Sequence, residues 1–170
     1  MQEAIQLQCL YMLAARAVEI GRIDDYLGEF YRKDLKTGRI THDQAVRLLD
    51  NFFTIIETQC GRDTRVIIGG MGREHEKSAD EFAMLVMDVL EVRREHFYPQ
   101  ISLRYYKEMN QDIYDRALRI LGSGMTFPML YNDDVNVPAV MRAMDVPKKA
   151  AEQYSFFGCG EYMLAAQSIG

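Results

Sequence analysis

The spacing of apolar residues predicts helices in the amino-terminal third of the chain. Residues 1 to about 20 carry a broad apolar stripe, and Gly21 is expected to end this helix. Thr41 stands three residues before Gln44, the spacing of a capping box, and predicts the start of a second helix. Its apolar positions recur every three or four residues: Ala45, Leu48, Leu49, Phe52, Phe53 and Ile56. We therefore predict a helical part over residues 1–60.

From residue 61 onward, short runs of β-branched and aromatic residues alternate with helical stripes. The predicted strands are 65–68, 100–106, 126–131 and 154–157. A capping box formed by Ser78 and Glu81 predicts one intervening helix, and Gly122 is expected to end another. Pro138 and Pro147 suit the first turns of two further helices. This alternation predicts an α/β fold, with parallel strands and helices packed outside them.

Composition and charge restrict the class of protein. The 170 residues are 48% hydrophobic and 26% charged with a net charge of -5, which is typical of a globular domain. Basic residues are interspersed with acidic ones, so no nucleic-acid partner is expected. The opening helix contains Glu3, Arg16 and Glu19, which argues against a signal peptide or a membrane span.

The cysteines and histidines give no sign of a metal site. Three widely separated cysteines, Cys9, Cys60 and Cys159, form no CxxC pair, and the histidines have no ligand spacing. We expect no bound metal and a reducing, cytoplasmic location. The segment VIIGGMGREHEKS superficially resembles a dinucleotide loop, but His75 replaces the third glycine. A plain turn from strand to helix is the better interpretation.

Two segments contain candidate site residues. In TFPMLYNDDVNVPAV, Asn132, Asp133 and Asp134 follow a predicted strand. Such residues can line the active site of a parallel barrel, or they can form turns and helix caps, and the residues alone favour the structural role.

The second segment is YSFFGCGEY, in which Gly158 and Gly160 flank Cys159 after an apolar strand. The glycines permit a tight turn that projects the thiol. In an extended chain Glu161 would lie on the same side as Cys159. The alternative is a buried cysteine that acts as a small hydrophobic residue, the usual fate of a free cysteine.

The order of four segments resembles the pyruvate formate-lyase family of glycyl radical enzymes. They are GRIDDYLGEFYRKDLKTGRITHDQAVRLLDNFF, PQISLRYY, TFPMLYNDDVNVPAVM and AEQYSFFGCGEY, similar to the family's helical stretch, its LSxR strand, its Asn-Asp strand and its cysteine loop. The resemblance implies a ten-stranded α/β barrel of two half-barrels, with the cysteine loop threaded into its centre. Residues 1–170 would be one partial barrel domain, in which strands and helices alternate over residues 61–170.

The resemblance also implies the chemistry. A glycyl radical would take hydrogen from the Cys159 thiol, and the thiyl radical would take hydrogen from a small polar substrate. Pyruvate formate-lyase itself has two adjacent cysteines, whereas Cys159 stands alone and is followed by Glu161, as in the dehydratase and lyase branch. There the glutamate acts as general base. Alternatively, Glu161 is a structural anion at the start of a helix over residues 162–167.

The sequence does not identify the leaving group. Gly160 and Tyr162 differ from the Val and Pro common in diol dehydratases, so C–O, C–N and C–S cleavage all remain. An arylacetate-type decarboxylase or a formate acetyltransferase-like member is the alternative within the family. The alternative of another class is a non-catalytic helical scaffold or binding module.

Length is the other departure from the family. Its members are several times longer, and no RVxGY-like motif for the radical glycine occurs here. We therefore expect an internal fragment that lacks the carboxyl-terminal glycyl radical domain, binds no cofactor itself and is inactive alone. The parent protein would be a homodimer whose radical is installed by an S-adenosylmethionine/iron–sulfur activating enzyme.

Overall fold

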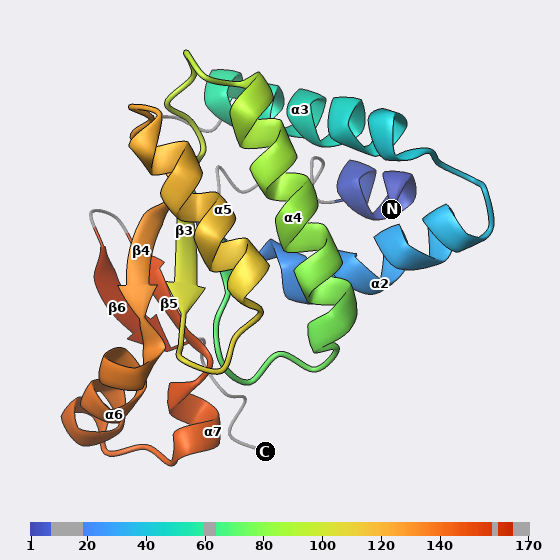
Figure 1. The fold of residues 1–170 in the computed structure, drawn as a ribbon. Helices are drawn as coiled ribbons and strands as arrows, with labels where there is room; N and C mark the ends of the chain where they lie inside the picture. The colour runs from blue at the N-terminus through green and yellow to red at the C-terminus, as the bar shows by residue number, and fades with distance from the viewer. Residues whose placement is uncertain (8–18, 60–63, 158–159, 165–170) are drawn as a thin grey trace.

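The computed structural model describes residues 1–7, 19–59, 64–157 and 160–164 (Figure 1). Residues 2–7 are helical. The following elements are β1 (Glu19–Arg22), α2 (Ile23–Lys36), α3 (His42–Gln59), β2 (Arg65–Gly69), α4 (Glu76–Val92), β3 (Gln100–Tyr105), α5 (Gln111–Gly122), β4 (Met129–Asn132), α6 (Asp133–Met144), α7 (Lys148–Ala151), β5 (Tyr154–Phe157) and β6 (Glu161–Leu164). None of the helices within these described ranges is long and apolar enough to cross a membrane.

Four parallel strands form the main sheet, in the order β1-β2-β3-β4. In β2, Val66 and Ile68 pack into the large core under the helices, whereas Ile67 belongs to a smaller cluster on the other face. Both faces are therefore buried, which explains the continuous apolar run of this strand. The predicted α/β fold with parallel strands and outer helices is confirmed.

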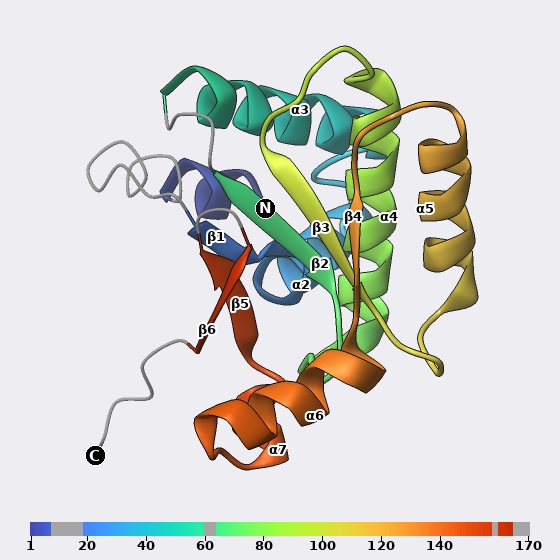
Figure 2. The ribbon, with the colours of Figure 1, turned by 90° about the vertical axis from the view of Figure 1, so that its left-hand side faces the viewer.

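The last predicted strand differs in direction. β5 pairs with β6 as an antiparallel hairpin, which lies on the side of the sheet away from α4 and α5 (Figure 2). The expectation of parallel strands was therefore wrong for β5. A parallel neighbour needs a long crossover, whereas only residues 158–160 join these two strands, and a connection of that length suits an antiparallel pair.

The amino-terminal prediction was also partly wrong. Gly21 was expected to end a helix, but it lies inside β1 and pairs with Val66 of β2; residues 8–18 of the predicted helix lie outside the described ranges. Pairing with a distant strand has overridden the helical pattern in so short a segment. Helix α2 lies within the predicted helical part over residues 1–60, but its bounds were not identified, although Asp24 and Asp25 in its first turn are typical of a helix start.

The capping predictions had mixed outcomes. At Thr41 the capping box is confirmed: Gln44 Oε1 accepts from the Thr41 N–H at 2.8 Å, and Thr41 Oγ1 accepts from the Gln44 N–H at 3.3 Å. At Ser78 it was wrong, because α4 already begins at Glu76 and Ser78 Oγ donates to the His75 carbonyl. Pro147 caps α7, whereas Pro138 lies inside α6 beyond its first turn.

Helices α2 and α4 approach closely at Gly28. A Cβ atom there would lie 2.7 Å from the backbone carbonyl carbon and oxygen of Ser78. We expect Gly28→Ala to destabilise the protein by about 1–3 kcal/mol, because backbone atoms cannot rotate away from the added methyl group. This loss exceeds the gain in helix propensity of at most about 1 kcal/mol.

Thermal unfolding measures the effect of Gly28→Ala as a lower melting temperature. Gly122→Ala is the matched control, because Gly122 ends α5 and a Cβ there would meet nothing within 4 Å. The control should leave the melting temperature unchanged or raise it. An equal response of the two variants would contradict the close approach.

Candidate active site

The β5–β6 hairpin is the candidate site, because Cys159 belongs to its connection. Cys159 and Gly158 lie outside the described residues, whereas Gly160 and Glu161 lie within them. Gly160 has a φ of 118°, a conformation that favours glycine. A Cβ on Gly160 would lie 3.5 Å from Tyr131 Oη. The turn next to Cys159 is thus close to the inner face of the main sheet.

The two faces of the hairpin differ in character. Tyr154, Phe156 and Tyr162 contact one another through their rings, and Phe156 also stacks on Tyr131 of β4 with ring centroids 3.9 Å apart. Side chains alternate between the faces of a strand, so Glu161 belongs to the face directed away from the sheet. Glu161 is exposed, and its carboxylate is open to a ligand from that side.

Glu161 does not begin a helix. It opens strand β6, which is extended through Leu164 and pairs with β5. The alternative of a structural anion at a helix start was therefore wrong for residues 161–164. Glu161 lies close to Cys159 in sequence and is exposed, which is compatible with a general base. That role stays a prediction.

Beneath the turn lies a polar group that the sequence had not singled out. Arg65 donates through one guanidinium nitrogen to Tyr131 Oη at 2.8 Å and through the other to Gln100 Oε1 at 2.9 Å. Its guanidinium carbon lies 5.6 Å from the Phe156 ring centre. The available signal was an arginine at the start of an otherwise apolar strand. Arg65 and Tyr131 support the hairpin near its turn.

A buried ionic cluster lies at the other end of β5. Arg104 donates to both carboxylate oxygens of Asp133, at 3.0 and 2.8 Å, and both side chains are fully buried. Tyr154 Oη donates to Asp133 Oδ1 at 2.6 Å, and its ring centre lies 3.7 Å from the Arg104 guanidinium carbon. We call Arg104, Asp133 and Tyr154 the buried triad. The sequence argument assigned no role to Arg104 or Tyr154.

The other two predicted site-lining residues make structural contacts. Asn132 Oδ1 accepts from the Asp134 N–H at 3.0 Å and caps α6, while Asp134 Oδ2 accepts from the Lys107 N–H at 2.9 Å. Asp133 is occupied by the buried triad. All three therefore stabilise the carboxyl ends of β3 and β4, and a site-lining role for them remains a prediction.

The hydroxyl groups of Tyr154 and Tyr162 keep their protons at neutral pH, because the pKa of each is raised. Burial raises the pKa of Tyr154 above its ordinary value, and the Asp133 carboxylate raises it further. Burial also raises the pKa of Tyr162, to which the neighbouring Tyr131 adds. Tyr154 is therefore fixed as a hydrogen-bond donor to Asp133.

The glycine-rich turn after β2 is a strand-to-helix turn, as the sequence favoured. The N–H of Gly69 donates to the Asp24 carboxylate at 2.7 Å, and the N–H of Met71 donates to that of Asp133 at 2.8 Å. The two backbone N–H groups are thus already bonded to carboxylates. A bound phosphate would need N–H donors of this kind. These two donors are therefore not available to a phosphate.

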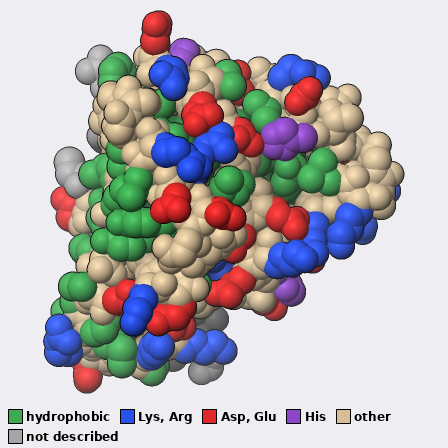
Figure 3. All heavy atoms as spheres, viewed as in Figure 1, with side chains coloured by type: hydrophobic (Ala, Val, Ile, Leu, Met, Phe, Trp, Pro, Cys, Tyr) green, Lys and Arg blue, Asp and Glu red, His purple; other side chains and the backbone are tan. Residues whose placement is uncertain are grey.

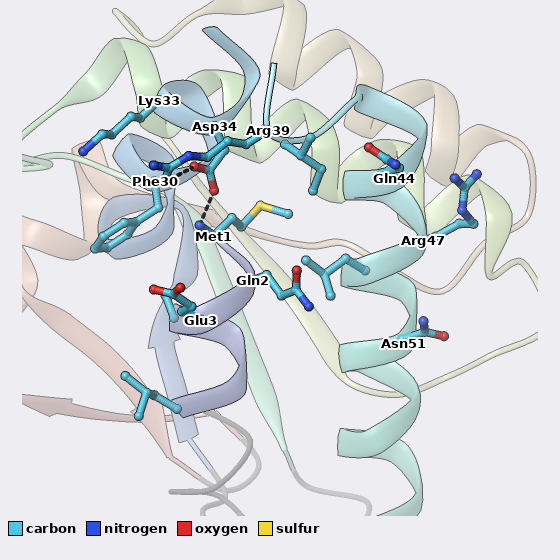
Figure 4. A pocket seen from close by; sticks show the side chains of 14 residues that line it. Met1, Gln2, Glu3, Phe30, Lys33, Asp34, Arg39, Gln44, Arg47 and Asn51 are labelled. Atoms are coloured by element: carbon cyan, nitrogen blue, oxygen red, sulfur yellow. Dashed lines mark hydrogen bonds and ion pairs between the residues drawn. The ribbon is translucent and has the colours of Figure 1, made fainter. Parts of the chain in front are cut away.

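A pocket of about 850 Å³ lies elsewhere, between residues 1–7, α2, α3 and the loop that joins these helices (Figure 4). Lys33, Arg39 and Arg47 contribute to its lining, and the Met1 amino group bonds to Asp34 at 2.6 Å. No residue of the described part of the hairpin lines it.

Across the ranges that the structure describes, no group of three or more His, Cys, Asp or Glu could hold a metal ion. Acidic and basic side chains are interspersed on the face in Figure 3.

Four parallel strands with helices on one face and the β5–β6 hairpin on the other define a layered α/β fold. Residues 1–170 match the family model described as Pyruvate formate lyase-like. The chain belongs to this family, whose members matched here are glycyl radical enzymes.

Relatives with dehydratase and lyase names show the degree of similarity. The probable dehydratase YbiW of Escherichia coli (strain K12) is 24% identical over 162 residues, which cover 85% of this chain and 20% of that protein. Isethionate sulfite-lyase of Nitratidesulfovibrio vulgaris is 27% identical over 183 residues, covering 94% and 22% respectively. The chain therefore spans about a fifth of the length of these relatives.

Solved structures agree with the barrel assignment. A glycyl radical enzyme from Archaeoglobus fulgidus superposes with a TM-score of 0.71 at 26% identity, over 85% of this chain and 20% of that one. Hydroxyproline dehydratase from Clostridioides difficile gives a TM-score of 0.70 at 22% identity, with the same coverage. The fold is thus that of a fragment of a glycyl radical enzyme barrel.

Proposed function

We propose that this chain is the part of a glycyl radical dehydratase or lyase that carries the substrate-activating cysteine, Cys159. One observation carries the proposal: the strands on either side of Cys159 form a hairpin on the inner face of the parallel sheet. A barrel interior is enclosed and can exclude water, as a radical intermediate requires. Residues 1–170 would be a partial barrel domain, and the radical glycine would lie in another segment of the parent protein.

Two side chains of the hairpin would perform the reaction. The Cys159 thiol gives its hydrogen atom to the glycyl radical, and the thiyl radical then takes a hydrogen atom from a substrate carbon. Glu161 accepts the proton of a hydroxyl group on that carbon. The resulting electron-rich radical expels the leaving group from the neighbouring carbon. The product radical takes a hydrogen atom back from Cys159, the thiyl radical takes one back from the radical glycine, and Glu161 gives its proton to the departing group.

The substrate class follows from the relatives and from the cysteine. Their names include isethionate sulfite-lyase, (2S)-3-sulfopropanediol dehydratase and trans-4-hydroxy-L-proline dehydratase. These names support a small polar substrate for the parent of this chain. Cys159 has glycine on both sides, so a second thiol for acyl transfer is missing beside it. Elimination is therefore favoured over transfer of an acyl group.

The partners complete the proposal. The family implies a glycyl radical and an enzyme that installs it. We infer an S-adenosylmethionine/iron–sulfur activating enzyme, a homodimeric parent and an anaerobic cytoplasm. The test is to activate the parent protein without oxygen and supply diols, sulfonates and hydroxyproline. A glycyl radical signal in electron spin resonance with loss of one substrate supports the proposal, and a radical without any turnover of these classes argues against it.

We expect the 170-residue chain alone to have no turnover. The relatives that it matches are about five times as long, so the radical glycine and much of the pocket would be supplied by other segments. Product analysis by chromatography tests this with the same substrate panel, and the activated parent protein serves as the positive control. Turnover by the purified chain without the rest of the parent would contradict the assignment.

A further inference from the structure

In the part of the chain that the structure describes, no strand pairing joins the β5–β6 hairpin to the main sheet. Within the described residues, β5 pairs only with β6, and the main sheet ends at β1 and β4. β5 lies beside β1 and β2 (Figure 2), and its Tyr154 and Phe156 share an apolar cluster with Ile67 of β2. Ladder hydrogen bonds set the register of paired strands, whereas packed apolar side chains are not directional. Some other contact must determine how far the hairpin extends along the sheet.

Directional contacts are concentrated where the chain enters β5. Arg104 donates to the Tyr154 carbonyl at 2.9 Å and to the Glu152 carbonyl at 3.0 Å, besides its two bonds to Asp133. Arg22 donates to the same Glu152 carbonyl at 3.1 Å. Arginines from β1 and β3 thus hold the backbone at the point where it turns toward Cys159.

Stability alone does not account for a buried ion pair. Desolvation of two charges offsets most of their attraction, and well-packed apolar residues often stabilise a protein as much or more. What a fork-shaped guanidinium adds is geometry, because its donors have fixed directions. Here the Arg104 guanidinium contacts the Asp133 carboxylate, the Tyr154 ring and the carbonyl groups of Glu152 and Tyr154. It thereby fixes one end of the hairpin.

We propose that the buried triad of Arg104, Asp133 and Tyr154 is a positioning device that sets where β5, the strand that leads to Cys159, lies along the sheet. The inference rests on the proposed function, since it assigns the triad to the same site. Arg104 touches no reacting atom, so it is a positioning residue. Only four residues separate Tyr154 from Cys159, and a shift at the start of β5 moves the whole hairpin relative to the substrate.

The test uses the full parent protein with Arg104→Lys and Tyr154→Phe. Lysine keeps the charge but loses the forked geometry, and phenylalanine keeps the ring but loses the bond to Asp133. We expect kcat per glycyl radical to fall about 10- to 100-fold, with KM changed less than about threefold, since small misplacements of a reacting group have effects of this size. If Arg104→Lys does not fold, Tyr154→Phe decides.

Arg73→Lys is the matched control. Arg73 is also buried and paired with two carboxylates, those of Asp24 and Asp80, but in the described structure it bonds to no residue of β5. A purely structural role predicts equal loss of melting temperature and normal kcat in all folded variants. Normal kcat in Tyr154→Phe and Arg104→Lys, or an equal fall of kcat in Arg73→Lys, would overturn the inference.

A second readout separates this inference from the proposed function. In the non-activated parent, iodoacetamide alkylation of each cysteine is followed by mass spectrometry of its peptide. Triad variants should change the Cys159 rate by about threefold or more, since access governs thiol reactivity, while Cys9 and Cys60 react as before. An unchanged Cys159 rate counts against positioning. Failure of the unsubstituted protein to form radical or product refutes the proposed function, and the alkylation result then decides the positioning role.

Discussion

Cys159→Ser should abolish turnover in the activated parent protein while the glycyl radical remains obtainable. Serine has nearly the shape of cysteine, but its O–H bond is too strong for a carbon radical to break. Radical installation acts on the glycine and does not need the thiol. Electron spin resonance of the variant, together with a product assay, measures both halves of the expectation.

The control for this variant is Cys60→Ser. It removes a thiol from a segment that the proposed chemistry does not use, and its turnover should equal that of the parent. Product formation by Cys159→Ser would remove Cys159 from the mechanism. Loss of the radical signal as well as turnover would contradict the claim that the thiol acts only after the radical is installed.

Glu161→Gln should lower turnover about 100- to 10,000-fold, the range expected for loss of a general base. Glutamine keeps the size of the side chain and its hydrogen bonding, but it cannot accept the substrate proton. Hydrogen abstraction by Cys159 precedes this step, so the variant should still exchange hydrogen between substrate and thiol. Mass spectrometry of deuterium-labelled substrate in ordinary water measures the exchange, alongside the product assay.

Glu95→Gln provides a matched control, because Glu95 is exposed on the loop after α4 and distant in sequence from the hairpin. It should leave turnover unchanged. Nearly normal product formation by Glu161→Gln would reject the base role. That result would favour a reaction, such as decarboxylation, in which another group handles the proton.

The parts of the fold that the sequence predicted are those with a strong local signal. β2 and β3 were found because β-branched and aromatic residues gather there in short runs, and both strands are largely buried. Helix α3 was found because an apolar face and a capping box agree. By contrast, β1 has only four residues, one of them Gly21, and it is a strand because it pairs with β2. A pairing of that kind is not visible in local spacing.

In the candidate site, too, the sequence revealed residues that are close together along the chain and missed those that are far apart. Glycine-flanked Cys159 and Glu161 are two positions apart in sequence, so a single segment drew attention to both. Arg104, in contrast, meets Asp133 and Tyr154 across 29 and 50 residues. No periodicity connects such distant positions. An arginine inside an apolar strand signals a buried partner, but it does not identify which one.

The attachment of the β5–β6 hairpin by side chains has a consequence for how such enzymes diversify. No ladder hydrogen bond in the described part joins the hairpin to the main sheet. Its residues are therefore not constrained by a fixed strand register against that sheet. Residues on its outer face can then change without altering the scaffold. A hairpin graft between relatives that retains Tyr154 and its partners becomes a rational route to exchange one reaction for another.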